Sequence, residues 1–193
     1  TPTHYTPQLR AIIASARVQG LKIPLLWNSS AYEKVDALKS LNSLVDIYLP
    51  DLKYSHGVYA KKYSHAADYP TLALDAIKEM YSQVGPLSLD ADGIAQKGVL
   101  VRLLVLPLGL SGTENSLRRL ADEIGTDVPV SLMGQYYPAG DAWRYPELGR
   151  GVSKDEYQKV LDTANELGFS NVYVQELSSN DFWTPKFIQE QQD

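Results

Sequence analysis

The chain has 193 residues and a net charge of -5, and 44% of its residues are hydrophobic and 21% charged, the balance of a soluble globular domain. Its 18 Lys and Arg residues are scattered, and no apolar run approaches the roughly 20 residues that span a bilayer, so we expect neither a nucleic-acid partner nor a membrane. The lack of cysteine excludes disulfides and thiolate ligands within these residues, and His4, His56 and His65 match no metal-ligand spacing.

The first half of the chain has the pattern of helix, strand, helix and strand. Thr6 is suited to cap a helix that begins at Pro7 and ends at Gly20. The pattern then predicts a strand at 21–27, a helix capped by Ser30 with Tyr32, Val35, Leu38 and Leu41 facing inward, and a strand at 44–49. The segment 54–70 is predicted to be a long loop with room for a short helix.

The second half continues this alternation. In chain order, it predicts a helix opened by Asp68 and Pro70 and closed by Gly85, a strand at 98–107, a helix at 114–124, a strand at 128–134, a helix with a Ser153–Glu156 capping box, and a strand at 171–177. The polar and aromatic segment 136–151 is predicted to be a surface or lid loop. Since no repeat, low-complexity stretch or linker interrupts the pattern, we predict one domain over residues 1–193.

The fold class follows from the strands. Their Val, Ile and Leu runs are nearly continuous, which is typical of strands covered on both faces in a parallel α/β sheet with right-handed crossovers. Five strands are few for a barrel, and the opening "TPTHYTPQL" has the character of a loop that follows a strand. We therefore expect the C-terminal part of a partial parallel (β/α) barrel, whose first one or two strands lie outside this sequence.

The segment "DIYLPDLKY", residues 46–54, places an acid and a base where a buried strand ends. Pro50 has no backbone N–H to donate, so it is expected to end the strand. Extended geometry puts Asp51 and Lys53 on one side of the chain. Because active sites of parallel α/β barrels form at the C-terminal ends of the strands, we expect both charges at the mouth of the barrel.

Other predicted strand ends also carry polar groups. They are Thr3 and His4 in "TPTH", Asn28 and Ser29 in "WNSS", and Gln135 and Tyr136 in "GQYY", while Arg102 lies within the apolar run 98–107. Each has an ordinary structural interpretation: a solvated ion pair worth about 0–1 kcal/mol, an arginine paired with a structural carboxylate, or turn and cap chemistry. Their shared position at one end of the predicted sheet favours a binding site.

These residues carry a resemblance to a known family. The segments "TPTHYTPQL", "IPLLWNSSAYE", "DIYLPDLKY", "YSHAADYP", "GVLVRLLVLP" and "SLMGQYYP" resemble, in order and from residue 1 to about 150, radical S-adenosylmethionine (radical SAM) enzymes related to pyruvate formate-lyase-activating enzyme. The resemblance implies a partial (β/α)6 barrel. It also implies a [4Fe–4S] cluster held by a CxxxCxxC motif, and cleavage of S-adenosylmethionine to a 5′-deoxyadenosyl radical. The cysteine motif is then expected upstream of Thr1.

The resemblance also implies a set of S-adenosylmethionine ligands. Thr3 and His4 fall near the amino group, Asn28 and Ser29 near the ribose or methionine part, Asp51 and Lys53 at an Asp-x-Lys that activating enzymes share, Arg102 near the carboxylate, and Gln135 and Tyr136 near the adenosine. Two positions depart from the family pattern, because Leu103 and Tyr136 stand where histidines are expected.

The implied partners are S-adenosylmethionine, an electron donor and a substrate, either a glycyl-radical enzyme or another molecule, with the cytoplasm as the default compartment. Two alternatives stay open. One is a cluster-free barrel lyase or hydrolase that uses Asp51, Lys53 or His4, although Asp51 disfavours Schiff-base chemistry at Lys53 because it favours the charged amine. The other is a degenerate, non-catalytic barrel that acts as an interaction domain.

Overall fold

A seven-stranded, mostly parallel sheet forms the centre of the computed structural model, which describes residues 2–175. The strands are β1 (Leu26–Ser29), β2 (Ile47–Leu52), β3 (Ser88–Leu89), β4 (Ala95–Val99), β5 (Val101–Leu104), β6 (Val130–Met133) and β7 (Val172–Val174). Their order is β3-β4-β2-β5-β6-β7, with β1 paired to β2, and each pairing is parallel except β3–β4. The predicted parallel α/β sheet is thus confirmed, whereas the partial barrel stays a prediction.

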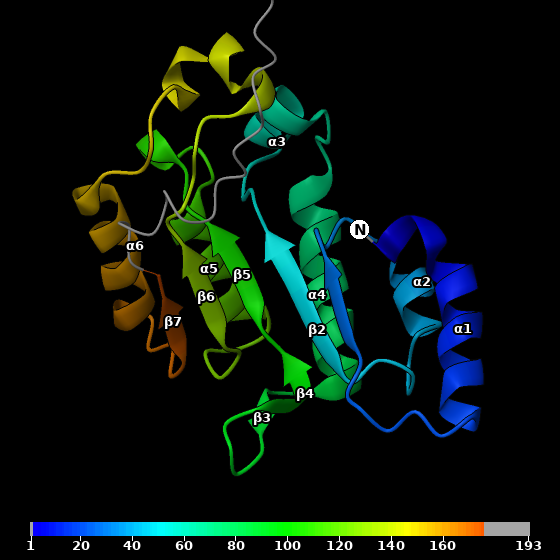
Figure 1. Ribbon diagram of the computed structural model, residues 1–193. Coiled ribbons are helices and arrows are strands. Elements are labelled where there is room, and N and C mark those ends of the chain that lie inside the picture. The colour runs from blue at the N-terminus through cyan, green and yellow to red at the C-terminus, as the bar shows by residue number, and fades with distance from the viewer. Residues whose placement is uncertain (1, 176–193) are drawn as a thin grey trace, which may run out of the picture.

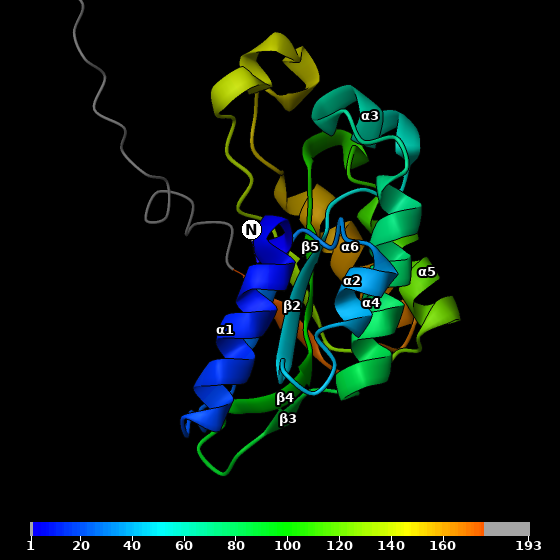
Figure 2. The same cartoon turned by 90° about the vertical axis from the view of Figure 1, so that its right-hand side faces the viewer.

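Helices connect the parallel strands, as the alternation predicted. They are α1 (Thr6–Val18), α2 (Val35–Lys39), α3 (Gly57–Ser64), α4 (Tyr69–Val84), α5 (Thr113–Glu123) and α6 (Lys154–Glu166), with short 3-10 turns at η1 (Pro2–Tyr5), η2 (Pro107–Gly109), η3 (Gly140–Arg144) and η4 (Pro146–Leu148). Figure 1 looks onto the sheet with α4 and α5 behind it, and Figure 2 shows α2, α4 and α5 together on one side of the strands. No helix within residues 2–175 is long and apolar enough to cross a membrane.

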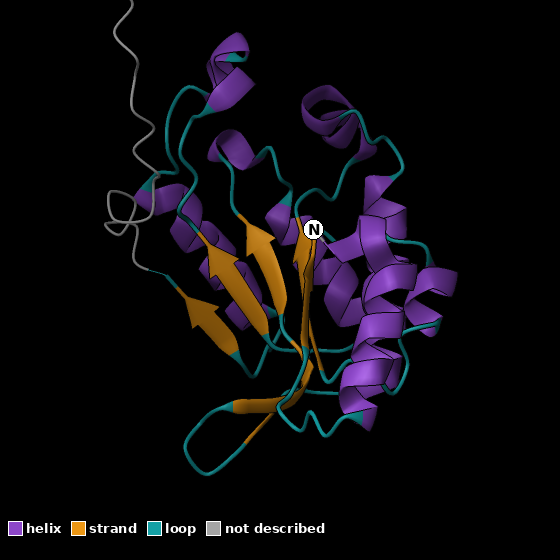
Figure 3. Ribbon diagram, turned by 45° about the vertical axis from the view of Figure 1, so that its right-hand side comes forward, coloured by secondary structure: helices purple, strands orange, loops and turns teal. Residues whose placement is uncertain are grey.

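The two faces of the sheet differ in burial, which corrects the expectation of strands covered on both sides. Trp27, Tyr48, Leu103 and Leu132 are buried and join the main core with α4 and its neighbours. The residues that alternate with them, such as Asn28, Asp51, Arg102 and Ser131, are half-buried or exposed. Figure 3 shows β5, β6 and β7 in front of the helices that pack on their far side. The sequence hid this alternation because apolar residues, Leu49, Leu104 and Met133, also lie on the open face.

Strand boundaries are shifted from the predicted ones for local reasons. β1 begins at Leu26, five residues later than the predicted start of this strand at residue 21. The carbonyls of Leu21 and Ile23 instead accept hydrogen bonds from Arg17 Nη1, each at 3.0 Å. Pro50 does not end β2, because it lies within the strand opposite Ser29. The predicted strand at 98–107 corresponds to the end of β4 and the whole of β5. Both pair with β2 in the same register, and Leu100 separates them. The β3–β4 hairpin was not predicted, and residues 176 and 177 of the predicted last strand lie outside the described range.

Helix starts were predicted with mixed success. The Ser153–Glu156 capping box of α6 is confirmed. The Thr6 prediction is wrong, because its hydroxyl donates to the carbonyl of Thr3 and Tyr5 takes the cap position. Ser30 does not cap α2, which begins at Val35 after Lys34.

The inward face predicted for the segment before β2 is only partly correct. Leu38 and Leu41 are buried as expected. Tyr32 is 41% exposed, because it lies before α2 rather than in it. Its hydroxyl donates instead to the Asp68 carboxylate at the start of α4, at 2.7 Å. Asp68 therefore occupies the cap position of α4, but its side chain accepts no hydrogen bond from the helix backbone.

Candidate functional site

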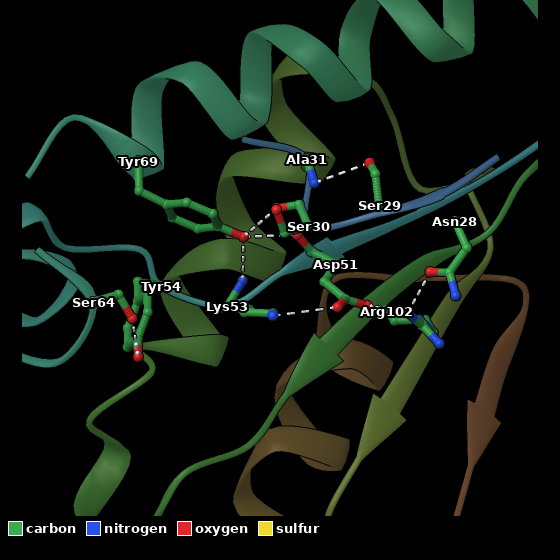
Figure 4. A network of polar contacts seen from close by, with 10 residues as sticks. All are labelled: Asn28, Ser29, Ser30, Ala31, Asp51, Lys53, Tyr54, Ser64, Tyr69 and Arg102. Carbon is green, nitrogen blue, oxygen red and sulfur yellow. Dashed lines mark hydrogen bonds and ion pairs between the residues drawn. The ribbon is translucent and has the colours of Figure 1, made fainter. Parts of the chain in front are cut away.

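Three neighbouring strands bring an acid, an amide and an arginine together on the open face of the sheet. Asp51 of β2 is paired in register with Arg102 of β5. Arg102 Nε and Nη2 lie 2.7 and 2.6 Å from Asp51 Oδ1, and Nη2 also donates to Asn28 Oδ1 of β1 at 2.8 Å (Figure 4). The prediction that these three residues share one end of the sheet is confirmed.

Lys53 adds a second cation to this group. Its Nζ lies 3.5 Å from Asp51 Oδ2, and its side chain is 39% exposed, against 15% for Asp51. One carboxylate therefore faces two cations, and the group carries a net charge of +1. Within residues 2–175, Arg102 Nη1 has no hydrogen-bond partner, so the cations keep free donors. We call Asn28, Asp51, Lys53 and Arg102 the strand-end cluster.

Tyr69, the first residue of α4, supports the backbone of this cluster. Its hydroxyl lies 2.9 Å from the Lys53 amide nitrogen, which donates to it, 2.7 Å from the Asp51 carbonyl oxygen and 3.0 Å from the Ser30 carbonyl oxygen (Figure 4). Burial of the phenol raises the pKa of Tyr69, so it stays protonated at neutral pH. Sequence reasoning missed this residue, and the only signal was its place between a cap position and Pro70.

Glu33 organises a second polar group, on the buried side of β1. This carboxylate is 5% exposed and accepts hydrogen bonds from Thr3 Oγ1 at 2.8 Å, Trp27 Nε1 at 3.1 Å and Ser29 Oγ at 2.9 Å. Ser29 also accepts from the Ala31 amide, at 3.2 Å. Ser29 thus lies on the opposite face from Asn28. Sequence reasoning missed Glu33, although it is the last residue of the quoted segment "WNSSAYE" and follows Ser29 by four positions.

The remaining predicted ligands have surroundings of their own. His4 is exposed in η1, next to Thr3. Gln135 is half-buried directly after β6, at the same end of the sheet. Tyr136 donates from its hydroxyl to the Leu148 carbonyl at 3.0 Å, and burial raises its pKa. Contacts of Thr3, His4, Ser29, Gln135 and Tyr136 with a cofactor stay predictions.

Loops after β2, β5 and β6 meet in what we call the aromatic cluster. It contains Leu106, Leu110 and Leu148 with Tyr54, Tyr59, Tyr63, Tyr136 and Tyr145 packed against them. Tyr63 and Tyr145 pack edge to face with ring centroids 5.1 Å apart. The predicted loop at 136–151 is thus an ordered cover made of η3 and η4, and the short helix allowed for in 54–70 is α3.

A charged contact fastens this cover to α3. Glu147 of η4 forms an ion pair with Lys62, and Tyr63 donates to Glu147 Oε1 at 2.8 Å. The Tyr145 hydroxyl donates to the Lys62 carbonyl at 3.1 Å. The hydrogen bond from Lys62 lowers the pKa of Glu147 to about 2. Glu147 is therefore an anion at neutral pH and holds two side chains of α3.

The donor set decides which small molecules suit the site. No cysteine is present, and residues 2–175 contain no group of three or more His, Asp or Glu side chains placed to hold a metal ion. A [4Fe–4S] cluster therefore has no ligands here. Two cations with free donors suit a carboxylate, and the Asn28 and Asp51 oxygens suit hydroxyl or ammonium groups. The strand-end cluster thus fits a small zwitterion.

Comparisons with known proteins place the fold. The crystal structure of a domain of pyruvate-formate lyase-activating enzyme from Bacteroides vulgatus superposes with a TM-score of 0.62 over 91% of this chain and 94% of that domain, at 14% identity. Such a likeness shows the fold alone, a mixed α/β fold that this chain shares with that domain. An uncharacterised protein of Methanocaldococcus jannaschii is 26% identical over 168 residues, 87% of this chain and 46% of that protein. The chain thus spans about half the length of this relative. No family profile matches the chain.

Proposed function

We propose that the strand-end cluster binds S-adenosylmethionine in a protein of the radical SAM kind. The observation that carries the proposal is that Asp51 forms ion pairs with both Lys53 and Arg102, while Arg102 Nη1 donates to no group within residues 2–175. A ligand carboxylate can take a charge-assisted hydrogen bond from each cation, while Asn28 and Asp51 oxygens meet the ligand ammonium or ribose hydroxyls. The shared fold with a domain of pyruvate-formate lyase-activating enzyme supports this choice among zwitterions.

The chain's own part in such chemistry is to bind, orient and shield. When bound, S-adenosylmethionine supplies a carbon–sulfur bond that a one-electron reductant can cleave. Asp51 sets the separation of the two cations, and these would fix the methionine end of the ligand. The aromatic cluster, which lies over the ends of β2, β5 and β6, would limit the access of water. A [4Fe–4S] cluster would need ligands outside these 193 residues, and an electron donor and a protein or other substrate complete the proposal.

Titration calorimetry with three related ligands tests this proposal. S-adenosylmethionine should bind the 193-residue protein more tightly than methionine, which lacks the nucleoside, and than methylthioadenosine, which lacks the carboxylate and ammonium groups. The Arg102 Nε and Asn28 amide signals should move in NMR spectra as the ligand is added. Equal affinity for S-adenosylmethionine and methylthioadenosine would contradict a carboxylate site at Lys53 and Arg102, and so would binding that leaves these signals in place.

The cluster-free lyase or hydrolase has less support. A Schiff-base lysine must be a neutral amine when it reacts, and a carboxylate oxygen 3.5 Å from Lys53 Nζ favours the charged form. His4, the other base considered, lies exposed in η1. A cation-lined binding site therefore accounts better for the geometry than acid–base catalysis does.

A further inference from the structure

The backbone ladder between β1 and β2 stops just before Asp51 and Lys53 of the strand-end cluster. The last paired residues are Ser29 and Pro50. Beyond them, the carbonyls of Ser30 and Asp51 and the amide of Lys53 need partners, because buried backbone groups without hydrogen bonds are costly. None of the described strands supplies these partners, although two of the three groups belong to Asp51 and Lys53 of the site.

The Tyr69 hydroxyl meets all three of these groups. It accepts from the Lys53 amide at 2.9 Å and shares its own proton between the Asp51 and Ser30 carbonyls, at 2.7 and 3.0 Å. The side chain comes from α4, which packs behind the sheet, and the residue is only 5% exposed. A phenol is suited to this task because one oxygen can both donate and accept.

The Tyr69 ring is also held firmly in place. It packs edge to face with Tyr54, at 5.8 Å between ring centroids, and lies 5.8 Å from the Tyr32 ring. These neighbours direct their hydroxyls elsewhere, Tyr54 to Ser64 and Tyr32 to Asp68. Of these three rings, Tyr69 alone bonds to the backbone that carries Asp51 and Lys53.

We infer that Tyr69 is a positioning residue of the binding site. Its hydroxyl stands in for the missing strand partner and fixes the backbone from Asp51 to Lys53, which sets the separation of the Asp51 carboxylate and the Lys53 ammonium. The inference rests on the proposed function for the identity of the ligand. Phenylalanine would fill the same space but would leave two carbonyls and an N–H without their partner.

The test compares Tyr69→Phe with Tyr54→Phe and Tyr32→Phe, which remove hydroxyls from the neighbouring rings. In the ligand-free protein, hydrogen exchange of the Lys53 amide, followed by NMR, should speed up in Tyr69→Phe and in neither control. S-adenosylmethionine affinity should fall about three- to tenfold in Tyr69→Phe, the range that one hydrogen bond explains, and stay within about twofold in Tyr32→Phe, whose ring is not part of the aromatic cluster. Unfolding by urea gives the stability of each variant, so that affinities are compared at equal folded fraction.

The outcomes separate this inference from the proposed function. Equal Lys53 exchange rates in Tyr69→Phe and Tyr54→Phe would overturn the positioning role, and so would unchanged affinity in Tyr69→Phe. If the wild-type protein does not bind S-adenosylmethionine, the proposed function fails, and the exchange rate of the Lys53 amide in Tyr69→Phe and the two controls decides on Tyr69. If Tyr69→Phe does not fold, replacement of Tyr69 by 4-aminophenylalanine keeps donors for the two carbonyls but supplies only a poor acceptor for the Lys53 amide. That variant should fold and still exchange the Lys53 amide faster than the wild type. Exchange as slow as in the wild type would also overturn the role.

Discussion

Asp51 contacts both cations of the strand-end cluster, and it can do so because adjacent parallel strands are in register. Arg102 lies directly across from it on β5, and Lys53 follows two residues later on the same side of β2. The Asp51 side chain is 15% exposed, so its charge is partly removed from water and depends on these partners. The contribution of each cation can therefore be separated by substitution.

Lys53→Ala and Arg102→Ala should each weaken S-adenosylmethionine binding by roughly 10- to 100-fold, because a hydrogen bond to a charged group is worth about 1.5–3 kcal/mol. Asp51→Asn should weaken it less, since the amide keeps one acceptor. Calorimetry on each variant measures this, with Lys61→Ala on α3 as an exposed cationic control. Wild-type affinity in both the Lys53 and Arg102 variants would mean that these residues only form structural ion pairs with Asp51 and do not bind the ligand.

Glu33 gives a prediction about stability rather than binding. Glu33→Ala leaves three donors, on Thr3, Trp27 and Ser29, without an acceptor, and should lower the free energy of unfolding by about 2–4 kcal/mol. Glu33→Gln should cost less, because its carbonyl oxygen still accepts. Urea unfolding measures both, and Asp36→Ala on the exposed side of α2 is the control. An unfolding midpoint unchanged by Glu33→Ala would show that the network adds no stability.

How much of the site could be predicted depended on which residues share a strand. The rule that parallel strands end at one edge was enough to predict that Asn28, Asp51 and Arg102 lie at one end of the sheet, although not that they contact one another. Ser29 was grouped with Asn28 because both were placed in a loop. With β1 at Leu26–Ser29, strand alternation puts the two on opposite faces. Tyr69 reaches the site from a helix, and the hydrophobic pattern of α4 does not specify where its first side chain points.

At the scale of elements, the cover over the strand ends is held by few but specific contacts. The turns η3 and η4 begin and end near glycines, and η4 is fastened to α3 through Glu147. Sequence patterns predicted neither contact, because Lys62 and Glu147 are far apart in the chain and lie outside regular amphipathic repeats. Hydrophobic periodicity did predict α4 and α6 as helices, since one side of each packs on the sheet.

The Glu147 ion pair makes the attachment of η4 dependent on pH. The folded-state pKa of about 2 lies below the ordinary value of 4.5, so the stabilisation is fully present above pH 4.5 and is lost as the pH falls through about 2. NMR titration of the Glu147 side-chain carboxyl should give a pKa near 2 in the wild type and a value closer to 4.5 in Lys62→Met. Lys61→Met on the same helix is the control. An unshifted Glu147 in the wild type would mean that the ion pair does not persist in solution.

The β3–β4 hairpin contains a glycine with little tolerance for a side chain. Gly98 has a φ of +122°, and a Cβ there would lie 2.4 Å from Leu87 Cα and from the Pro86 carbonyl oxygen. Gly98→Ala should therefore cost about 3 kcal/mol or more of unfolding free energy, the sum of backbone strain and a clash that side chains cannot relieve. Gly93→Ala, at φ +79° with open space around it, should cost only about 1 kcal/mol. Equal costs by urea unfolding would mean that the hairpin shifts to admit the methyl group.

At the scale of the whole molecule, the sheet presents an exposed apolar edge at β1. Among the described strands β1 pairs only with β2, and Ile23 and Leu26 beside this edge are 64% and 52% exposed. Ile12 and Val18 of α1 are also exposed, at 62% and 89%. An unpaired edge with apolar side chains favours association with another strand.

The isolated 193-residue protein should therefore self-associate as its concentration rises and bind dyes that fluoresce on apolar surfaces. Leu26→Lys should reduce both effects, because a charged side chain on an edge strand opposes pairing. Val58→Lys on α3, where Val58 is 75% exposed, is the control and should leave both unchanged. Sedimentation velocity measures the association. A monomer at all concentrations, or equal effects of the two variants, would show that the protein does not self-associate through this edge.

Strand β2 is central to the sheet, since it is hydrogen-bonded to β1 along one edge and to β4 and β5 along the other. Its amides should open to solvent only when the whole domain unfolds. Asp51 lies in this strand, and Lys53 follows it with its amide held by Tyr69. A ligand would then meet groups that are already ordered, with little conformational entropy left to lose. The heat capacity change on binding should accordingly be small and reflect only the apolar area of the ligand itself, without a contribution from coupled folding.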